Sequence, residues 1–205
     1  MKGLLLKDFY MLIYYGKVFL LLMLVFLVAG TAIEQNTVFL FFPCLFAGIL
    51  PMTLQAYDER SGWCHFSGTL PYTRAQLVSV KYLFALLLGG AVVLLTTVLF
   101  VVSSAPVFSL PKLLALLAAA GTVTLLVPAL LLPFVFRFGS EKGRIAYLIL
   151  VGGLCAGGLF FLRGGQGQPS LPGWAGPGVF FGAAMLLFAG SWLLSVSIYQ
   201  ARESV

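Results

Sequence analysis

Apolar residues form six long runs along this chain, and the charged residues lie between or beside those runs. The runs cover residues 18–33, 37–56, 82–104, 113–136, 145–162 and 178–199. A helix rises about 1.5 Å per residue, so roughly 20 apolar residues cross a hydrocarbon core about 30 Å thick. Because the backbone cannot bond to water inside lipid, each run is expected to be helical. The pattern predicts an all-α, polytopic membrane protein with six transmembrane helices in one domain, residues 1–205.

The first sixteen residues differ from the runs because they mix charged and apolar side chains. Leu5, Phe9, Leu12 and Ile13 are spaced to share one face of a helix. This spacing predicts an interfacial helix over residues 1–16 that lies against the membrane and leads into the first span. The alternative is a frayed extension of that span.

Composition and charge placement support a membrane protein and argue against a nucleic-acid partner. Hydrophobic residues make up 61% of the chain, charged residues only 9%, and the mean hydropathy is +1.07. A soluble domain has about one-quarter charged residues. With six spans and a cytoplasmic N-terminus, every lysine and arginine except Lys112 and Arg163 falls on the inner side. This positive-inside bias predicts that both termini are cytoplasmic, and it accounts for the net charge of +6.

The inner loop 57–74 is the longest polar stretch and is predicted to be ordered. A short helix is expected from about Asp58 to Ser67, with Asp58 and Glu59 at its N-terminus, where acidic groups favour the helix dipole. Trp63 and Phe66 would then lie one turn apart on one side of the helix. The alternative is that the loop is only an interfacial anchor for the membrane.

The end of this loop carries signals that stop one helix and start the next. Pro71 cannot continue a helix, and Thr73 followed by Gln76 forms a capping box at the start of the third span. The second inner loop, 137–144, is short and charged. Further along, Gly153 and Gly157 form a small-x-x-x-small pattern that lets two membrane helices approach closely.

The chain lacks the residues that most membrane enzymes and ion-coupled transporters need. It has no phosphate-binding loop, no metal-ligand spacing among its cysteines, and no ionisable residue in the middle of a span. Cys64 and His65 are neighbours, but adjacent residues of a helix point about 100° apart. A transport route lined by apolar and small polar groups would suit an amphipathic or lipophilic cargo. The energy for transport is then expected from a separate ATPase.

Several motifs resemble those of a known family when they are taken in order. They are Met1-Lys2-Gly3-Leu4-Leu5-Leu6-Lys7-Asp8, Tyr57-Asp58-Glu59, Trp63, Thr69-Leu70-Pro71, Arg74, Lys81-Tyr82, and Phe138-Gly139-Ser140-Glu141-Lys142-Gly143-Arg144. This set resembles the small type-2 ABC exporter permeases over the whole chain. The group includes the membrane subunits of exporters for phenol-soluble modulins and related antimicrobial peptides in Gram-positive bacteria.

The resemblance implies an architecture, partners and sites. It implies six helices per subunit, two permease subunits per pore as a homodimer or with a related paralogue, and two copies of a cytoplasmic ATPase subunit that holds ATP and magnesium. It implies a coupling helix over 58–67, with Trp63 and Phe66 as anchors, a charged rim of Asp58, Glu59 and Arg60, and a second contact at 141–144. The predicted ATPase-coupling residues are Asp58, Glu59, Arg60, Trp63, Phe66, Leu70, Pro71, Glu141, Lys142 and Arg144.

The leading hypothesis is therefore a permease subunit, not itself an enzyme and without a cofactor of its own. It would sit in the bacterial plasma membrane among lipid and export amphipathic or hydrophobic peptides with energy from its ATPase partner. Export of lipophilic drugs or lipids is the closest alternative. An intramembrane thiol enzyme that uses Cys64 and a non-catalytic membrane scaffold are the other hypotheses.

Overall fold

A computed structural model describes residues 2–32, 37–67, 69, 71–103, 110–163 and 175–202 of the chain. These residues form helices and no strands, which confirms the all-α class. The helices are α1 (Lys2–Tyr15), α2 (Lys17–Ala32), α3 (Thr37–Arg60), α4 (Trp63–Ser67), α5 (Arg74–Ser103), α6 (Leu110–Phe138), α7 (Ser140–Arg163) and α8 (Ala175–Arg202).

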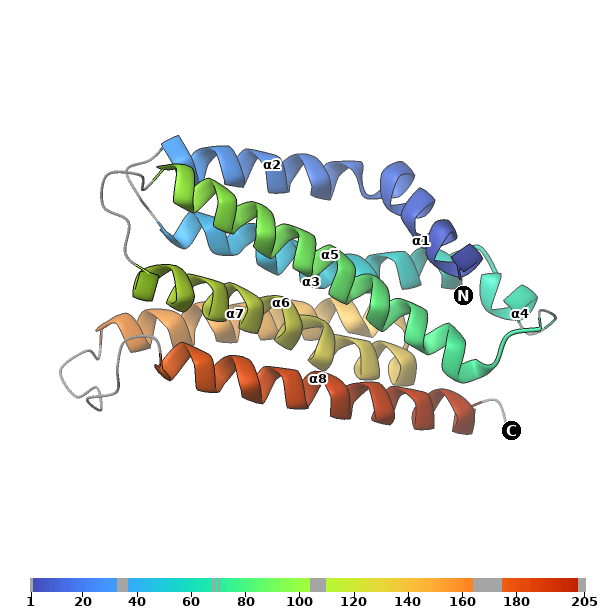
Figure 1. The fold of residues 1–205 in the computed structure, drawn as a ribbon. Helices are drawn as coiled ribbons and strands as arrows, with labels where there is room; N and C mark the ends of the chain where they lie inside the picture. Colours follow the sequence, from blue (N-terminus) through green and yellow to red (C-terminus); the bar gives the residue numbers. More distant parts are fainter. Residues whose placement is uncertain are drawn as a thin grey trace.

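The long helices α2, α3, α5, α6, α7 and α8 run up and down a single bundle, as Figure 1 shows. Both labelled chain ends lie at one end of this bundle, together with α4. The turn between α6 and α7 lies there too, because Ser140 at the start of α7 is bonded to Glu59 near the end of α3. We call this the charged end.

Three of the described helices are long and apolar enough to cross a membrane, and a bent pair adds a fourth candidate. The three are α5, α6 and α8, and the pair is α1 with α2, which meet at 73°. Gly16 separates the two, and a Cβ there would lie 2.5 Å from the carbonyl oxygen of Leu12. A side chain would therefore obstruct this bend. The number of spans, six in the sequence-based prediction, is not fixed by this result and stays a prediction.

Helix α6 is the centre of the packing. Its Ala120 belongs to a buried cluster with residues of α1, α2, α3 and α5. Its Val127, Leu131 and Val135 pack with Met52 of α3, and α7 covers that cluster. The opposite side of α6 packs against α5 and α8. The described residues of α6 therefore connect the other long helices.

The outer surface carries many exposed large apolar side chains, as expected for helices that face lipid. In α1, Phe9 and Ile13 of the predicted apolar face are exposed, whereas Leu12 is buried together with Leu4 and Asp8. The reason is the charge of Asp8, which draws that face of α1 inward toward lysine partners. That this helix lies against the membrane stays a prediction.

Close contacts between a helix backbone and a neighbouring side chain occur at Gly48 and Gly121, which the sequence analysis did not single out. A Cβ on Gly48 of α3 would lie 2.6 Å from Val127 of α6, and a Cβ on Gly121 of α6 would lie 2.6 Å from the Phe181 ring of α8. A Cβ on Gly153, in contrast, would meet nothing within 4 Å. Gly157 is the other glycine of the predicted pattern, and the surroundings of its Cα lie outside what the structure describes. The role of this glycine pair in helix packing stays a prediction.

Candidate functional site at the charged end

The chain changes direction sharply after α3, at a place the sequence pattern put inside a helix. Helix α3 continues through Asp58 and Glu59 to Arg60, and a turn at Ser61 and Gly62 precedes α4. Gly62 has a φ of 70°, a conformation that glycine adopts at little cost. The predicted helix from Asp58 to Ser67 is therefore corrected to Trp63–Ser67. Its two acidic residues lie in the last turn of α3.

Helix α4 holds two aromatic rings side by side, as their spacing predicted. The ring centroids of Trp63 and Phe66 are 5.6 Å apart. Trp63 is half-buried, whereas Phe66 is 57% exposed. After α4 the predicted capping box is confirmed, because the Thr73 amide donates to the Gln76 side chain and the Gln76 amide donates to Thr73 Oγ1. The connection between α3 and α5 thus has a defined geometry.

Four charged side chains meet beneath α4 in a ring of alternating sign. Lys7 Nζ lies 2.6 Å from Asp58 Oδ1 and 3.4 Å from Asp8 Oδ1. Lys81 Nζ lies 2.7 Å from Asp58 Oδ2 and 2.9 Å from Asp8 Oδ1. We call these four residues the ionic ring. It ties α1, α3 and α5 together although its bonded residues are up to 73 positions apart in sequence.

Three of the four members of the ionic ring are buried, and that burial decides its energetic importance. Asp8 is 1% exposed, Asp58 2% and Lys81 6%. Removing one member of a buried ion pair leaves an uncompensated charge, which costs about 3 to 5 kcal/mol, even where the intact pair adds little net stability. The ring therefore specifies how α1, α3 and α5 meet.

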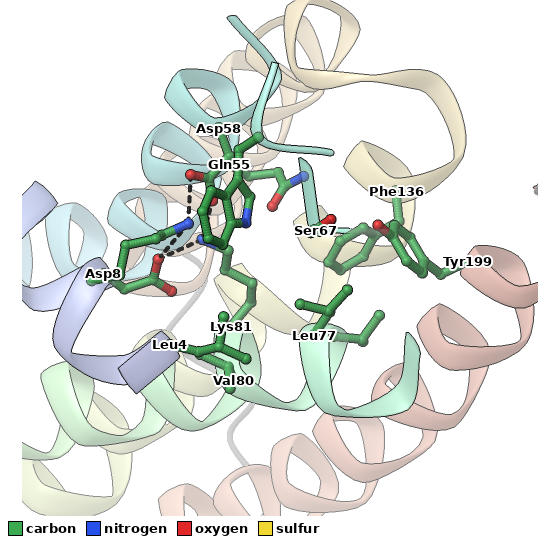
Figure 2. Close-up of a pocket in the computed structure, with 13 residues that line it drawn as sticks. Leu4, Asp8, Gln55, Asp58, Ser67, Leu77, Val80, Lys81, Phe136 and Tyr199 are labelled. Atoms are coloured by element: carbon green, nitrogen blue, oxygen red, sulfur yellow. Dashed lines mark hydrogen bonds and ion pairs between the residues drawn. The ribbon is translucent and has the colours of Figure 1, made fainter. Parts of the chain in front are cut away.

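Trp63 connects the ionic ring to α4. Lys7 Nζ lies 4.2 Å from the centre of the Trp63 ring, a distance at which a cation is attracted to an aromatic face. A small cavity of about 30 Å³ lies beside the ionic ring, and the residues labelled in Figure 2 line this cavity. Within the described part of the chain, Asp8 Oδ2 is buried without a hydrogen-bond partner. The cavity is large enough for a water molecule, but not for an organic ligand.

The second predicted contact region also differs from its expected shape. Instead of a loop over 137–144, only Gly139 separates α6 from α7, with a φ of 86°. Glu59 Oε2 accepts a hydrogen bond of 3.0 Å from the Ser140 amide, so it caps the N-terminus of α7. Glu141, Lys142 and Arg144 lie on the first turns of α7 and are exposed.

The structure separates the predicted ATPase-coupling residues by exposure, with Trp63 half-buried between an exposed group and a group with internal contacts. Arg60, Phe66, Pro71, Glu141, Lys142 and Arg144 are exposed. Asp58 and Glu59 instead make contacts inside the chain, so Asp58 does not form part of an outer rim. Leu70 lies outside the described residues, as do the side chains of Cys64 and His65. The coupling role of all ten stays a prediction.

Sequence reasoning missed the ion pairs of Lys7, Asp8 and Lys81, because it treated these residues as charges at span ends and as parts of separate motifs. One signal was present in the sequence. Lys81 lies within the stretch 77–88, in which every other residue except one serine and one tyrosine is apolar. A lysine in such a position is costly unless an acidic partner neutralises it. Among the described residues, no group of three or more histidine, cysteine or acidic residues could hold a metal.

Comparison with known proteins decides the family. The family model described as "ABC-2 family transporter protein" matches residues 3–200, nearly the whole chain. The chain belongs to the ABC-2 family of transporter proteins. No individual curated protein and no solved structure matches it significantly. An ABC-2 permease is a membrane subunit, and its family membership implies an ABC ATPase as partner.

Proposed function

We propose that this ABC-2 protein is the permease subunit of an exporter for amphipathic or hydrophobic peptides, driven by a separate ATPase. Two copies of the chain, or one copy and a related paralogue, would form the pathway, and two ATPase subunits would bind ATP and magnesium. Support for the general class comes from the family match over residues 3–200. Support for a separate energy source comes from the sequence, which has no phosphate-binding loop.

The observation that carries the proposal is the construction of the charged end. There α4 presents the exposed ring of Phe66, and the start of α7 presents Glu141, Lys142 and Arg144. Exposed aromatic and arginine residues are the types that dominate the binding energy of protein interfaces. We assign this surface to the ATPase. Because nearly all lysines and arginines belong to this end, the positive-inside rule supports a cytoplasmic location for it.

Motion at α4 has a direct physical route into the membrane helices. Phe66 contacts Trp63, Trp63 contacts Lys7, and the ionic ring joins Lys7 to α3 and α5. Glu59 continues the route from α3 to α7. When ATP closes the paired ATPases, a displacement of α4 would thus shift α1, α3, α5 and α7 together. Such rigid movement of packed elements is a common way to switch between two states.

The polar groups inside the bundle favour a cargo with apolar surface. The hydroxyls of Thr97 and Thr122 donate to carbonyls of their own helices, as do those of Thr96 and Thr124, which are buried. Hydroxyls bonded in this way offer few donors to a polar cargo. An amphipathic peptide suits such surroundings, and lipophilic drugs and lipids are the alternatives.

The test is a pair of alanine substitutions at exposed phenylalanines. Phe66→Ala should weaken copurification of the ATPase and its stimulation by the permease, because an interface anchor contributes about 2 kcal/mol or more. Phe180→Ala is the matched control, since Phe180 is 63% exposed on α8 near the opposite end of the bundle. Equal ATPase binding by both variants and the native chain would contradict the assignment of this surface.

The cargo needs a separate experiment. The permease and its ATPase, reconstituted together in vesicles, should move a labelled amphipathic helical peptide when ATP is supplied, and a lipophilic dye or labelled lipid more slowly. Faster transport of the dye or the lipid would reject the peptide proposal, while leaving the permease assignment intact.

A further inference from the structure

A lateral groove lies between α5 and α8, near the charged end but separate from the ionic ring. Its volume is about 300 Å³, at the lower end of the ~300 to 1,000 Å³ typical of ligand pockets. Its walls are Ser79, Tyr82, Leu83 and Leu86 of α5 and Phe188 and Trp192 of α8. Both helices are long and apolar enough to cross a membrane. Leu83 and Leu86 are 41% and 45% exposed, so the groove opens on the outer surface of these helices, the surface that would face hydrocarbon in a bilayer.

The polar atoms of the groove are already bonded within the chain. Trp192 Nε1 donates to Ser79 Oγ at 3.0 Å, and Ser79 Oγ donates to the Ala75 carbonyl. The Tyr82 hydroxyl lies 2.7 Å from both Ser191 Oγ and Ser195 Oγ. Because these polar atoms are bonded to one another, the surface of the groove that a ligand could contact is mainly apolar. The occupant that fits is a hydrocarbon chain rather than a polar molecule.

A positive charge lies beyond one end of the groove, about 7.5 Å along α5 from Ser79 at 1.5 Å per residue. Arg74 at the start of α5 is exposed and donates to the Gln200 carbonyl of α8, which holds the two helix ends together. In Figure 1 the two helices approach at this end and separate toward the other. From Arg74 to Leu86 is about 18 Å along a helix, at 1.5 Å per residue. Guanidinium binds phosphate through paired hydrogen bonds.

We propose that the groove between α5 and α8 holds one acyl chain of an anionic phospholipid, with its phosphate beside Arg74. The apolar walls select the chain, and Arg74 selects the charge of the head group. Two features distinguish such a site from the general lipid layer around the protein. One is a preference for anionic lipid, and the other is dependence on the shape of the groove. Neither depends on the cargo or on the ATPase.

Quenching of Trp192 fluorescence by brominated lipids tests the proposal. Trp63→Phe and Trp174→Phe leave Trp192 as the only tryptophan of the chain. The protein is placed in phosphatidylcholine nanodiscs that contain a trace of one brominated lipid. Brominated phosphatidylglycerol should quench Trp192 about as strongly as a fivefold higher concentration of brominated phosphatidylcholine. One basic residue is expected to give a preference of roughly this size. Arg74→Gln should remove that preference, and Lys17→Gln, which changes an exposed lysine on α2, should keep it.

A second pair of variants tests the groove itself. Leu86→Phe narrows the groove and should reduce quenching, whereas Leu94→Phe lies two turns further along α5 on its exposed surface and should not. Native mass spectrometry of the unmodified chain should show phosphatidylglycerol retained, with less retained after Arg74→Gln. Equal quenching by both lipids would mean ordinary surrounding lipid and overturn the proposal. The proposal would also be overturned if the fluorescence of Trp192 changed when an amphipathic peptide was added but was not quenched by brominated lipid.

Discussion

The charged end and the apolar middle of the bundle are held together in different ways. At the charged end, ion pairs at 2.6 to 2.9 Å join α1, α3 and α5. In the middle, the backbone of one helix approaches side chains of the next, as where Gly48 faces Val127 and Gly121 faces Phe181. Apolar surface gains little by leaving lipid for protein, so contacts of these two kinds carry the specificity of helix pairing in a membrane. The middle sets how closely helices approach, and the charged end sets which helices are joined by charge.

The largest expected effect comes from breaking the ionic ring. Lys81→Met would leave Asp8 and Asp58 buried with Lys7 as their one remaining cation in the ring. We expect a loss of about 3 to 5 kcal/mol in the free energy of unfolding, because an uncompensated buried charge is costly. Denaturant unfolding in detergent, followed by helical circular dichroism, measures this loss.

A second substitution shows whether the loss is electrostatic. Adding Asp8→Asn to Lys81→Met removes one negative charge as well as one positive charge, and should recover part of the stability. If the double variant is as unstable as the sum of its single variants, the effect of Lys81 is packing and the ionic ring has no special role.

How far the sequence predicted this end depends on whether a feature is local. The capping box of Thr73 and Gln76 and the neighbouring rings of Trp63 and Phe66 were predicted correctly, because both depend on residues within one turn. The ionic ring was not predicted, because it depends on how α1, α3 and α5 align in space. Spacing along one helix carries no information on that alignment.

Helix ends show the same limit. The pattern placed Asp58 at the start of a helix, since acidic residues favour N-termini. In the structure its ion pairs with Lys7 and Lys81 hold it at the end of α3. The apolar runs predicted the helical class well because membrane helices require continuous apolar sequence. They did not predict which glycines would lie at contacts.

A smaller effect is expected from closing the approach of α3 to α6. The Cβ in Gly48→Ala would lie 2.6 Å from Cβ and Cγ1 of Val127, and overpacking of this kind costs about 1 to 3 kcal/mol. Gly90→Ala is the control, because a Cβ there meets nothing within 4 Å. It should be neutral or stabilising, since alanine favours a helix by about 0.5 to 1 kcal/mol over glycine.

The compensating change for this contact is also available. The double variant Gly48→Ala with Val127→Ala adds one methyl group on α3 and removes two on α6. It should be more stable than Gly48→Ala alone in the same unfolding measurement. If Gly48→Ala behaves like Gly90→Ala, α3 and α6 do not approach closely, and the contrast between the two regions fails.

The smallest expected effect concerns the bond that extends the charged end to α7. Glu59→Ala removes the acceptor of the Ser140 amide, and loss of a helix cap costs about 1 kcal/mol. Hydrogen exchange at Ser140 should then accelerate roughly fivefold, by the conversion of 1.4 kcal/mol per tenfold. Glu59→Gln keeps an oxygen that can accept this bond and should show a smaller change. Exchange that responds to Glu141→Ala as strongly as to Glu59→Ala would mean that any negative charge near the α7 N-terminus suffices. In that case α7 is not tied to α3, and the movement of α4 would reach α1, α3 and α5 alone.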